Sequence, residues 1–235
     1  MTIKIFPELE QGSTEWLQAR AGIITASTIG KLISPKTLKP ADSEVSRRFL
    51  RELAVERITG QPTEQHETYA MRRGTAAEPW ARELYEQHYN PVTQVGFIRH
   101  EFPGLTLGVS PDGLIGDDLM LEIKSPGKDV HFQTLRNDQV PAWNLAQVHA
   151  AMLIADRGYI DFVSYCPSDP GFESMRLYVK RVERNETWDR LLIDTAAEAE
   201  EQIEKLIDEY WQAAEGRPHT PAVDVMEEET VELIA

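Results

Sequence analysis

The apolar positions of the chain follow one repeat before about residue 90 and another after it. In the first part they recur at three- and four-residue spacing, which is the period of a helix with one buried face. This pattern predicts four helices: a short one after Ser13, one around 26–33, one from Asp42 to a cap at Gly60, and one over 75–88. The first part of the chain is therefore expected to be helical.

From about residue 95 the apolar residues gather in short runs separated by Gly, Pro and Asp, which is typical of strands joined by tight turns. The expected strands are 95–98, 105–109, 119–123, 159–165 and 175–179. Pro141 can begin a helix that directs Leu145, Val148, Met152 and Leu153 inward. A long acidic helix should follow over 186–214. The order of elements predicts an α/β fold, with a central mixed β-sheet flanked by helices.

The bulk composition narrows the class of protein. A length of 235 residues fits a single domain, which we place at 1–215, followed by an acidic C-terminal tail at 216–235. The single cysteine, Cys166, cannot form an internal disulfide, so a reducing cytoplasm is expected. No apolar run has the length of a membrane span, and the first residues lack a signal-peptide pattern. We therefore expect a cytoplasmic protein with no membrane partner.

The net charge of −15 argues against a nucleic-acid partner unless the charge is unevenly distributed. It is uneven, because residues 181–235 carry −11 and the other 180 residues only −4. Residues 1–180 contain two basic groups. The first consists of Lys36, Lys39, Arg47, Arg48 and Arg51, and the second consists of Arg72 and Arg73. They are candidate DNA contacts, with ordinary solvated helix faces as the alternative.

The strongest chemical signal is Ser110-Pro111-Asp112-Gly113, followed ten positions after the aspartate by Leu121-Glu122-Ile123-Lys124. Alternate residues of a strand share a face, so Glu122 and Lys124 should point together and Ile123 to the other side. A turn at 113–118 would fold Asp112 back beside them. Two carboxylates and the Ile123 carbonyl suit Mg²⁺, which lowers the pKa of a bound water, while Lys124 can stabilise charge on a phosphate.

This constellation predicts phosphodiester hydrolysis. The alternative for an isolated Glu-x-Lys strand is an exposed ion pair, which would be favoured without the preceding Ser-Pro-Asp-Gly segment. Two further side chains can contribute. Glu78 could add a carboxylate from a helix, with Gly74 allowing close approach, or could be a surface residue. Gln147 lies in an apolar helix and would need polar partners if buried.

Several aromatic residues have a plain structural explanation. His149 occurs in an apolar helix, where a histidine is more often satisfied in the core than catalytic. Trp143, Trp188 and Trp211 are expected to be packing residues rather than platforms for base stacking.

Six segments occur in the order found in one family of nucleases: Trp16-x-x-x-Arg20-x-Gly22, Ile24-Thr25-Ala26-Ser27, Gly74-x-x-x-Glu78, Ser110-Pro111-Asp112-Gly113, Leu121-Glu122-Ile123-Lys124 and Ala146-Gln147-Val148. From about residue 12 to 210, the chain resembles the alkaline exonucleases of phage lambda type, the YqaJ-like viral recombinases. The resemblance implies a PD-(D/E)XK fold and a processive 5′-to-3′ exonuclease. Such an enzyme degrades one strand of linear double-stranded DNA to mononucleotides and leaves a 3′ overhang for a single-strand annealing protein.

The resemblance also implies roles for particular residues. Asp112, Glu122 and the Ile123 carbonyl would hold Mg²⁺, for which Mn²⁺ can substitute, with Lys124 as the catalytic lysine and Glu78 completing the acidic site. The 5′ phosphate would be held by Arg20, Ser27 and Gln147. The expected DNA contacts are Arg47, Arg48, Arg51, Arg72 and Met71, the last either an apolar wedge or a core residue.

The family resemblance further implies a homotrimeric ring, encoded by a phage or prophage in a bacterial host. Two rival functions stay open from the sequence. One is an endonuclease or RecB-like nuclease domain, which would share Asp112, Glu122, Lys124, Glu78 and Gln147. The other is a non-catalytic DNA-binding protein that has kept the fold.

Overall fold

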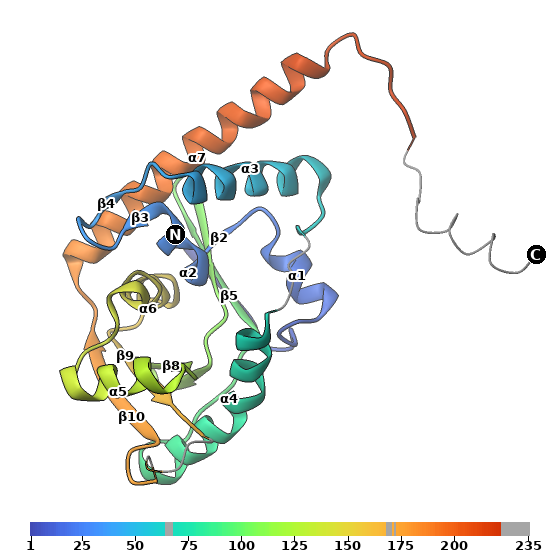
Figure 1. Ribbon diagram of the computed structural model, residues 1–235. Coiled ribbons are helices and arrows are strands. Elements are labelled where there is room, and N and C mark those ends of the chain that lie inside the picture. The colour runs from blue at the N-terminus through green and yellow to red at the C-terminus, as the bar shows by residue number, and fades with distance from the viewer. Residues whose placement is uncertain (64–67, 168–170, 172, 222–235) are drawn as a thin grey trace, which may run out of the picture.

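Two four-stranded sheets form most of the β structure in the computed structural model, which describes residues 1–63, 68–167, 171 and 173–221 (Figure 1). The first sheet has the order β1 (Thr2–Phe6), β5 (Phe97–Phe102), β6 (Leu105–Val109) and β2 (Ile24–Thr25). The second has the order β10 (Leu177–Glu183), β9 (Tyr159–Tyr165), β8 (Leu119–Lys124) and β7 (Gly113–Ile115). Each sheet is mixed, because β2 pairs with β6 and β8 with β9 in parallel, whereas the other pairs are antiparallel. A short pair, β3 (Ile33–Ser34) and β4 (Lys39–Pro40), stands apart.

The helices surround these sheets. They are α1 (Thr14–Arg20), α2 (Ala26–Ile29) with a 3-10 turn η1 (Gly30–Leu32), α3 (Glu44–Thr59), α4 (Tyr69–His88), α5 (Lys128–Asn137), α6 (Ala142–Ala155) and α7 (Glu186–Ala214). In Figure 1, α3 and α7 lie side by side, and the last turns of α7 extend beyond the sheets and the other helices. Arg57 of α3 binds Glu200 of α7 through two hydrogen bonds of 2.6 and 2.8 Å, which ties these helices together.

Strand β8 separates two apolar clusters. Its residue Met120 packs in the larger cluster with α6, whereas Leu121 and Ile123 pack in the smaller one with Ala81 and Tyr85 of α4. Helices α4 and α6 therefore cover opposite faces of the second sheet. The expectation that Ile123 faces away from Glu122 and Lys124 is confirmed.

The sequence pattern located most elements but not all of them. The bounds of β6, β9 and α7 agree with the prediction, and Gly60 caps α3 with φ 68°. The predicted α/β class, with mixed β structure flanked by helices, is confirmed, and the strands are divided between two four-stranded sheets, with β6 and β7 in different ones. Strand β1 was missed because its residues are mostly exposed, and α5 was missed because it buries only His131 and Thr134.

Some boundaries also differ. Helix α4 begins six residues before the predicted start at 75, because the Thr68 hydroxyl accepts from the Met71 amide and caps it. Ser43 rather than Asp42 caps α3. The predicted tail lies mainly in 222–235, outside the described residues. In the described part, no helix is both long and apolar enough to cross a bilayer.

Candidate active site

The Ser110-Pro111-Asp112 segment leads from β6 in one sheet to β7 in the other. Strand β7 pairs antiparallel with β8, and the turn at 116–118 folds the chain back as predicted. Asp112 Oδ2 consequently accepts a hydrogen bond of 2.5 Å from the Ile123 amide. Gly113 is required here for space, because a Cβ atom would lie 2.0 Å from Cγ1 of Val92.

Glu122 is the centre of the polar contacts on β8. Its side chain is almost fully buried, and its Oε1 accepts from both Lys124 Nζ and Gln147 Nε2 at 2.5 Å. The alternative of an exposed cross-strand ion pair is therefore wrong. Gln147 of α6 binds the acidic residue of the site, and no hydrogen bond to Arg20 or Ser27 is seen for it among the described residues.

Helix α4 brings a third carboxylate to the same place. Glu78 is half-buried, and Arg82, one helical turn later, donates to its Oε1. Arg82 Nε also donates to the main-chain oxygen of Asp112 at 3.0 Å. The sequence analysis missed Arg82, although its i, i+4 spacing from Glu78 is a signal that could have identified it.

Burial and neighbouring carboxylates raise the proton affinity of Asp112 and Glu78. Burial, followed by the negative charges of Glu122 and Glu78, raises the pKa of Asp112 well above its usual value. Burial also raises the pKa of Glu78, and Arg82 only partly opposes this. Burial alone would lower the pKa of Lys124, but Glu122 and Asp112 outweigh it, so its pKa is raised. Lys124 is therefore a cation at neutral pH, in a site with an excess of negative charge.

A cavity of about 520 Å³ opens over these groups. Its lining includes Glu78, Asp112, Glu122, Lys124, Asn144 and Gln147. A second cavity of about 660 Å³ adjoins it, and Trp16, Arg20, Ser27 and Met71 line both. The predicted phosphate-binding residues Arg20 and Ser27 thus lie on the wall between the predicted catalytic carboxylates and the second cavity.

Arg20 is half-buried, with its guanidinium against the ring of Trp16. Its guanidinium lies 3.9 Å from the centre of the Trp16 ring, and its Nη2 donates to Ser27 Oγ at 3.4 Å. Burial, partly offset by Glu56, lowers its pKa to about 10. Trp16 Nε1 in turn donates to Ser110 Oγ at 2.8 Å, which links α1 to the segment that carries Asp112. A half-buried guanidinium beside a hydroxyl is suited to bind an anion.

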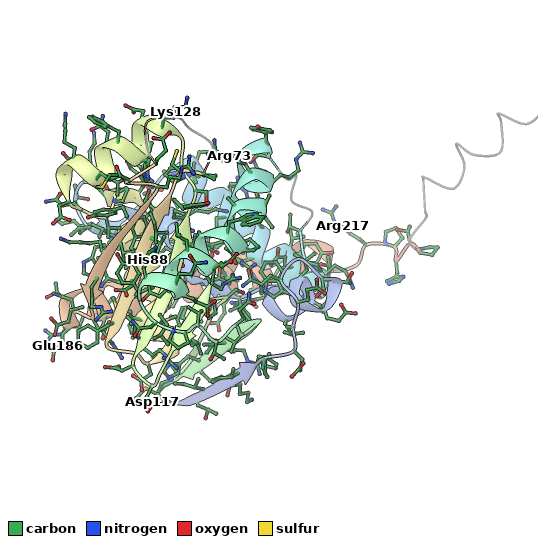
Figure 2. All side chains as sticks on the ribbon, turned by 90° about the horizontal axis from the view of Figure 1, so that it is seen from below. Arg73, His88, Asp117, Lys128, Glu186 and Arg217 are labelled. Atoms are coloured by element: carbon green, nitrogen blue, oxygen red, sulfur yellow. The ribbon has the colours of Figure 1, made fainter. Side chains whose placement is uncertain are left out.

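The first turns of α4 border the same cavities. Met71 is 48% exposed, so the alternative of a core residue is wrong. Figure 2 labels Arg73 towards the opposite end of α4 from His88. Its Nη2 donates a hydrogen bond of 2.8 Å to the carbonyl oxygen of Ser125, the residue that follows Lys124 in the chain. Arg72 is exposed on the same helix. Gly74 does not provide a close approach, because a Cβ atom there would meet nothing within 4 Å among the described residues.

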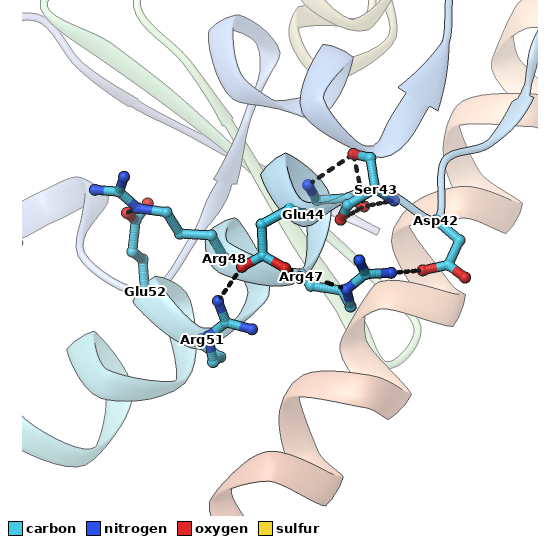
Figure 3. A network of polar contacts seen from close by, with 8 residues as sticks. Asp42, Ser43, Glu44, Arg47, Arg48, Arg51 and Glu52 are labelled. Carbon is cyan, nitrogen blue, oxygen red and sulfur yellow. Dashed lines mark hydrogen bonds and ion pairs between the residues drawn. The ribbon is translucent and has the colours of Figure 1, made fainter.

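The basic group on α3 is largely neutralised by neighbouring carboxylates (Figure 3). Arg47 pairs with Asp42 and Glu44, and Arg51 with the same Glu44 at 2.7 Å. Arg48 pairs with Glu52 at 2.8 Å and is the member of this group that lines the 660 Å³ cavity. The structure therefore brings Arg48 towards Arg20 but places Arg47 and Arg51 outside both cavities.

The aromatic predictions had mixed outcomes. His149 is buried and stacks on Trp188 with ring centres 4.7 Å apart, so the packing of both is confirmed, but His149 Nδ1 has no hydrogen-bond partner among the described residues. The packing roles of Trp143 and Trp211 were wrong, since these side chains are 63% and 57% exposed. Trp143 occupies the first turn of α6, on the wall of the catalytic cavity, and Trp211 lies beyond Ile203, the last buried residue of α7.

A resident cation would have to compete with contacts that the carboxylates already make. Within residues 1–63, 68–167, 171 and 173–221, no three Asp, Glu, His or Cys side chains are arranged to hold a metal ion. Asp112 binds the Ile123 amide, and Glu122 binds Lys124 and Gln147. The donor chemistry nevertheless fits a hard divalent cation, because it consists of carboxylate and carbonyl oxygens carrying excess negative charge.

Comparison with known proteins places this geometry in a family. The model of the YqaJ-like viral recombinase domain matches residues 15–158, which is more than half of the chain. The chain belongs to this family. The match includes every predicted catalytic and phosphate-binding residue from Arg20 to Gln147, and it confirms the family inferred from the sequence.

Solved structures agree with this YqaJ-like assignment. LHK-Exo, an alkaline exonuclease from Laribacter hongkongensis, is 30% identical, with a TM-score of 0.70 over 86% of this chain and 100% of that chain. Its complex with dAMP has a TM-score of 0.76 over 86% and 98%. A phage-related exonuclease from Haemophilus somnus 129PT, 16% identical, has a TM-score of 0.57 over 80% and 96%, which shows the fold alone. Among curated proteins, no sequence matches.

The fold of this YqaJ-like protein is thus of the PD-(D/E)XK type, as the sequence predicted. Its relatives are exonucleases, and its family is one of recombinases. Both relationships support a nuclease role in recombination.

Proposed function

We propose that this protein is a Mg²⁺-dependent 5′-to-3′ exonuclease that processively degrades one strand of linear double-stranded DNA. It would begin at a 5′-phosphorylated end, release mononucleotides and leave a 3′ single-stranded overhang for recombination by annealing. The observation that carries the proposal is the shared wall of the two cavities. Arg20 and Ser27, suited to a terminal phosphate, line the same cavity as Asp112, Glu122 and Lys124.

The chemistry follows from the groups around the cavity. Asp112, Glu122 and the Ile123 carbonyl would hold Mg²⁺, or Mn²⁺ in its place, which supplies an activated water and neutralises phosphate charge. Lys124, cationic beside Glu122, can orient the attacking water and stabilise the charge that develops on the scissile phosphate. Gln147 of α6 donates to the same carboxylate oxygen of Glu122 as Lys124 does. Glu78 adds negative charge at the cavity wall and can accept a hydrogen bond from water.

End recognition would come from Arg20. A half-buried guanidinium stacked on Trp16 is held in place to bind a phosphate through its forked donors, and Ser27 can donate to the same oxygens. Met71, exposed between the two cavities, would act as a wedge on the terminal base pairs. Arg48 and Arg72 would contact the DNA backbone, as would Arg47 and Arg51 after exchange of their carboxylate partners.

Further proposals rest on the family resemblance. We propose a homotrimeric ring, because a closed ring around DNA accounts for processivity, and light scattering of the purified protein tests it. The partner would be a single-strand annealing protein, and the location the bacterial cytoplasm, with the protein encoded by a phage or prophage. The charge distribution supports a DNA partner, since most of the negative charge lies in residues 181–235 rather than around the cavities.

The decisive experiment is a digestion of three substrates that differ in their ends. Linear duplex with a 5′ phosphate, the same duplex with a 5′ hydroxyl, and a closed circle are incubated with Mg²⁺ or with a chelator. We expect Mg²⁺-dependent loss of linear DNA only, faster from the phosphorylated end. Arg20→Ala should reduce this preference for phosphate while degradation from the hydroxyl end continues.

Other outcomes identify the rivals. Cleavage of the circle would indicate an endonuclease. Binding of linear DNA without any cleavage would indicate the non-catalytic DNA-binding protein. If Arg20→Ala slowed degradation equally from 5′-phosphate and 5′-hydroxyl ends, this would contradict the assignment of Arg20 to the terminal phosphate.

A further inference from the structure

Arg82 joins two of the acidic residues of the site through different edges of its guanidinium. Its Nε donates to the Asp112 carbonyl oxygen at 3.0 Å, and its Nη2 donates to Glu78 Oε1. With the side-chain amide of Gln94 assigned so that its oxygen rather than its nitrogen faces Arg82, that oxygen accepts from Nη1 at 2.7 Å and from Nη2 at 3.2 Å. Each of its three nitrogens therefore has an acceptor.

The environment makes this arrangement rigid. The Arg82 side chain is only 11% exposed, and it emerges from α4 between Ala81 and Tyr85, two residues of the apolar cluster that packs against β8. A planar guanidinium group held by three acceptors has little rotational freedom, unlike the ammonium group of a lysine. Arg82 thus defines the position of Glu78 relative to the main chain at Asp112.

The link matters because the two carboxylates come from independent parts of the fold. Glu78 belongs to helix α4, whereas Asp112 belongs to the segment that enters strand β7. Without a bridge, movement of α4 by a fraction of an ångström would change the distance between them. Groups that orient the residues of a metal or catalytic site typically change activity or metal affinity 10- to 100-fold when removed.

We propose that Arg82 is a positioning residue of this active site, which holds Glu78 against the Asp112 strand entry and aligns both for a divalent cation and the scissile phosphate. It does not contact the substrate itself. This role rests on the proposed nuclease function and adds to it a residue outside the set inferred from the sequence.

The test is a double-mutant cycle with Glu78. Single-turnover degradation of 5′-phosphorylated duplex is measured for the wild type, Arg82→Met, Arg82→Lys, Glu78→Ala and Glu78→Ala/Arg82→Met. We expect Arg82→Met to lower the rate about 100-fold in the wild-type background and less than about 10-fold in the Glu78→Ala background, with a change in KM for DNA below about 2-fold. Arg82→Lys should restore little, because it lacks the fork.

A matched control separates positioning from folding. Arg157 is another arginine bound to main-chain oxygens of the β7–β8 hairpin, but at the turn, where its Nη1 donates to Gly116 and Leu119 at 2.9 and 2.8 Å. Arg157→Met should lower the melting temperature and leave the rate within about 2-fold. An equal rate loss in Arg157→Met, or the full 100-fold loss when Glu78 is already absent, would overturn the proposal.

A second measurement is independent of nuclease activity. Calorimetric titration with Mg²⁺ or Ca²⁺ should show at least 10-fold weaker affinity in Arg82→Met, with Arg157→Met unchanged. A wild type that binds the cation but fails to degrade linear DNA would contradict the proposed function, and the titration alone would then decide the role of Arg82. Unchanged cation affinity in Arg82→Met would overturn that role.

Discussion

Glu122 shows how much of the site depends on single residues. Its carboxylate is almost completely buried, and its Oε1 accepts from Lys124 on the same strand and from Gln147 on α6. A buried carboxylate needs such donors because isolated charges are strongly destabilised away from water. The same carboxylate, together with Asp112, raises the pKa of Lys124, so the lysine is protonated at neutral pH and suited to the electrostatic role that we propose.

Replacement of Lys124 tests that role. Lys124→Ala should lower hydrolysis at least 100-fold, because the charge beside the scissile phosphate is lost. Binding of duplex DNA in Ca²⁺, measured by fluorescence anisotropy, should change less than about 3-fold. Lys205→Ala is the matched control, since that lysine is exposed on α7 and pairs only loosely with Glu209 at 3.8 Å. Full activity of Lys124→Ala would remove this lysine from the mechanism.

At the scale of elements, two contacts hold the parts that carry the site. One is the passage from β6 to β7, where Gly113 lies against Val92. The other is the contact between α6, which carries Gln147, and α7, where His149 stacks on Trp188. Neither contact includes a catalytic group, but each limits how the catalytic elements can move.

The two glycines of the sequence motifs should differ in their tolerance of a methyl group. Gly113→Ala forces a Cβ into Val92, so we expect a loss of roughly 1–3 kcal/mol in the free energy of unfolding, with reduced activity from displacement of Asp112. Gly74→Ala, inside α4 and facing open space, should be neutral or stabilise by about 0.5–1 kcal/mol. Urea denaturation of both variants measures this difference, and equal effects would contradict it.

His149 should make the α6–α7 contact sensitive to acid. Burial lowers its pKa to about 4, whereas an unfolded histidine titrates near 6.5. Between these values the unfolded chain binds a proton that the folded protein does not, so stability falls as the pH decreases through this window. At pH 5 the loss relative to pH 7 should be on the order of 2 kcal/mol.

The measurement for this prediction is urea denaturation at pH 7 and pH 5. The His149→Phe variant retains a ring against Trp188 but cannot titrate, and every other ionisable group is unchanged in it. Between pH 7 and pH 5, the free energy of unfolding of the wild type should therefore fall by about 2 kcal/mol more than that of the variant. The same pH dependence in both proteins would show that His149 does not contribute.

At the scale of the whole molecule, charge is divided between two regions. Residues 181–235, which include α7, hold most of the net charge of −15, whereas the cavities lie among the first 165 residues. The residues before 181, which line both cavities, carry a net charge of only −4. The cation that we propose could therefore bind either at the candidate active site or to the carboxylates of the acidic C-terminal region.

Thermal unfolding distinguishes these two places. A ligand that binds only the folded state at 100 times its dissociation constant stabilises by about 2.7 kcal/mol, which for this size corresponds to roughly 5–10 °C. We expect Mg²⁺ to raise the melting temperature of the wild type by several degrees over NaCl of equal ionic strength, and chelator to reverse this. Glu122→Gln should lose most of the rise. An equal rise in that variant would indicate binding to the acidic C-terminal region instead.

The sequence by itself determined the local features of this protein. Strand alternation placed Glu122 and Lys124 on one face, the ten-residue interval returned Asp112 beside them, and caps such as Gly60 ended helices where expected. These features follow from backbone periodicity and short-range hydrogen bonds, which depend on neighbours in the chain. The order of the motifs also identified the family.

Only the tertiary structure decided which distant groups meet. The binding of Gln147 to Glu122, the bridge from Arg82 to Asp112, the pairing of β1 with β5 and the exposure of Trp143 all depend on how separate elements pack. The same dependence divided the strands into two sheets and paired the α3 arginines with carboxylates. Burial and long-range hydrogen bonds depend on how the chain packs. The sequence pattern shows which kinds of group a residue can contact, but it does not show which residue lies opposite in the fold.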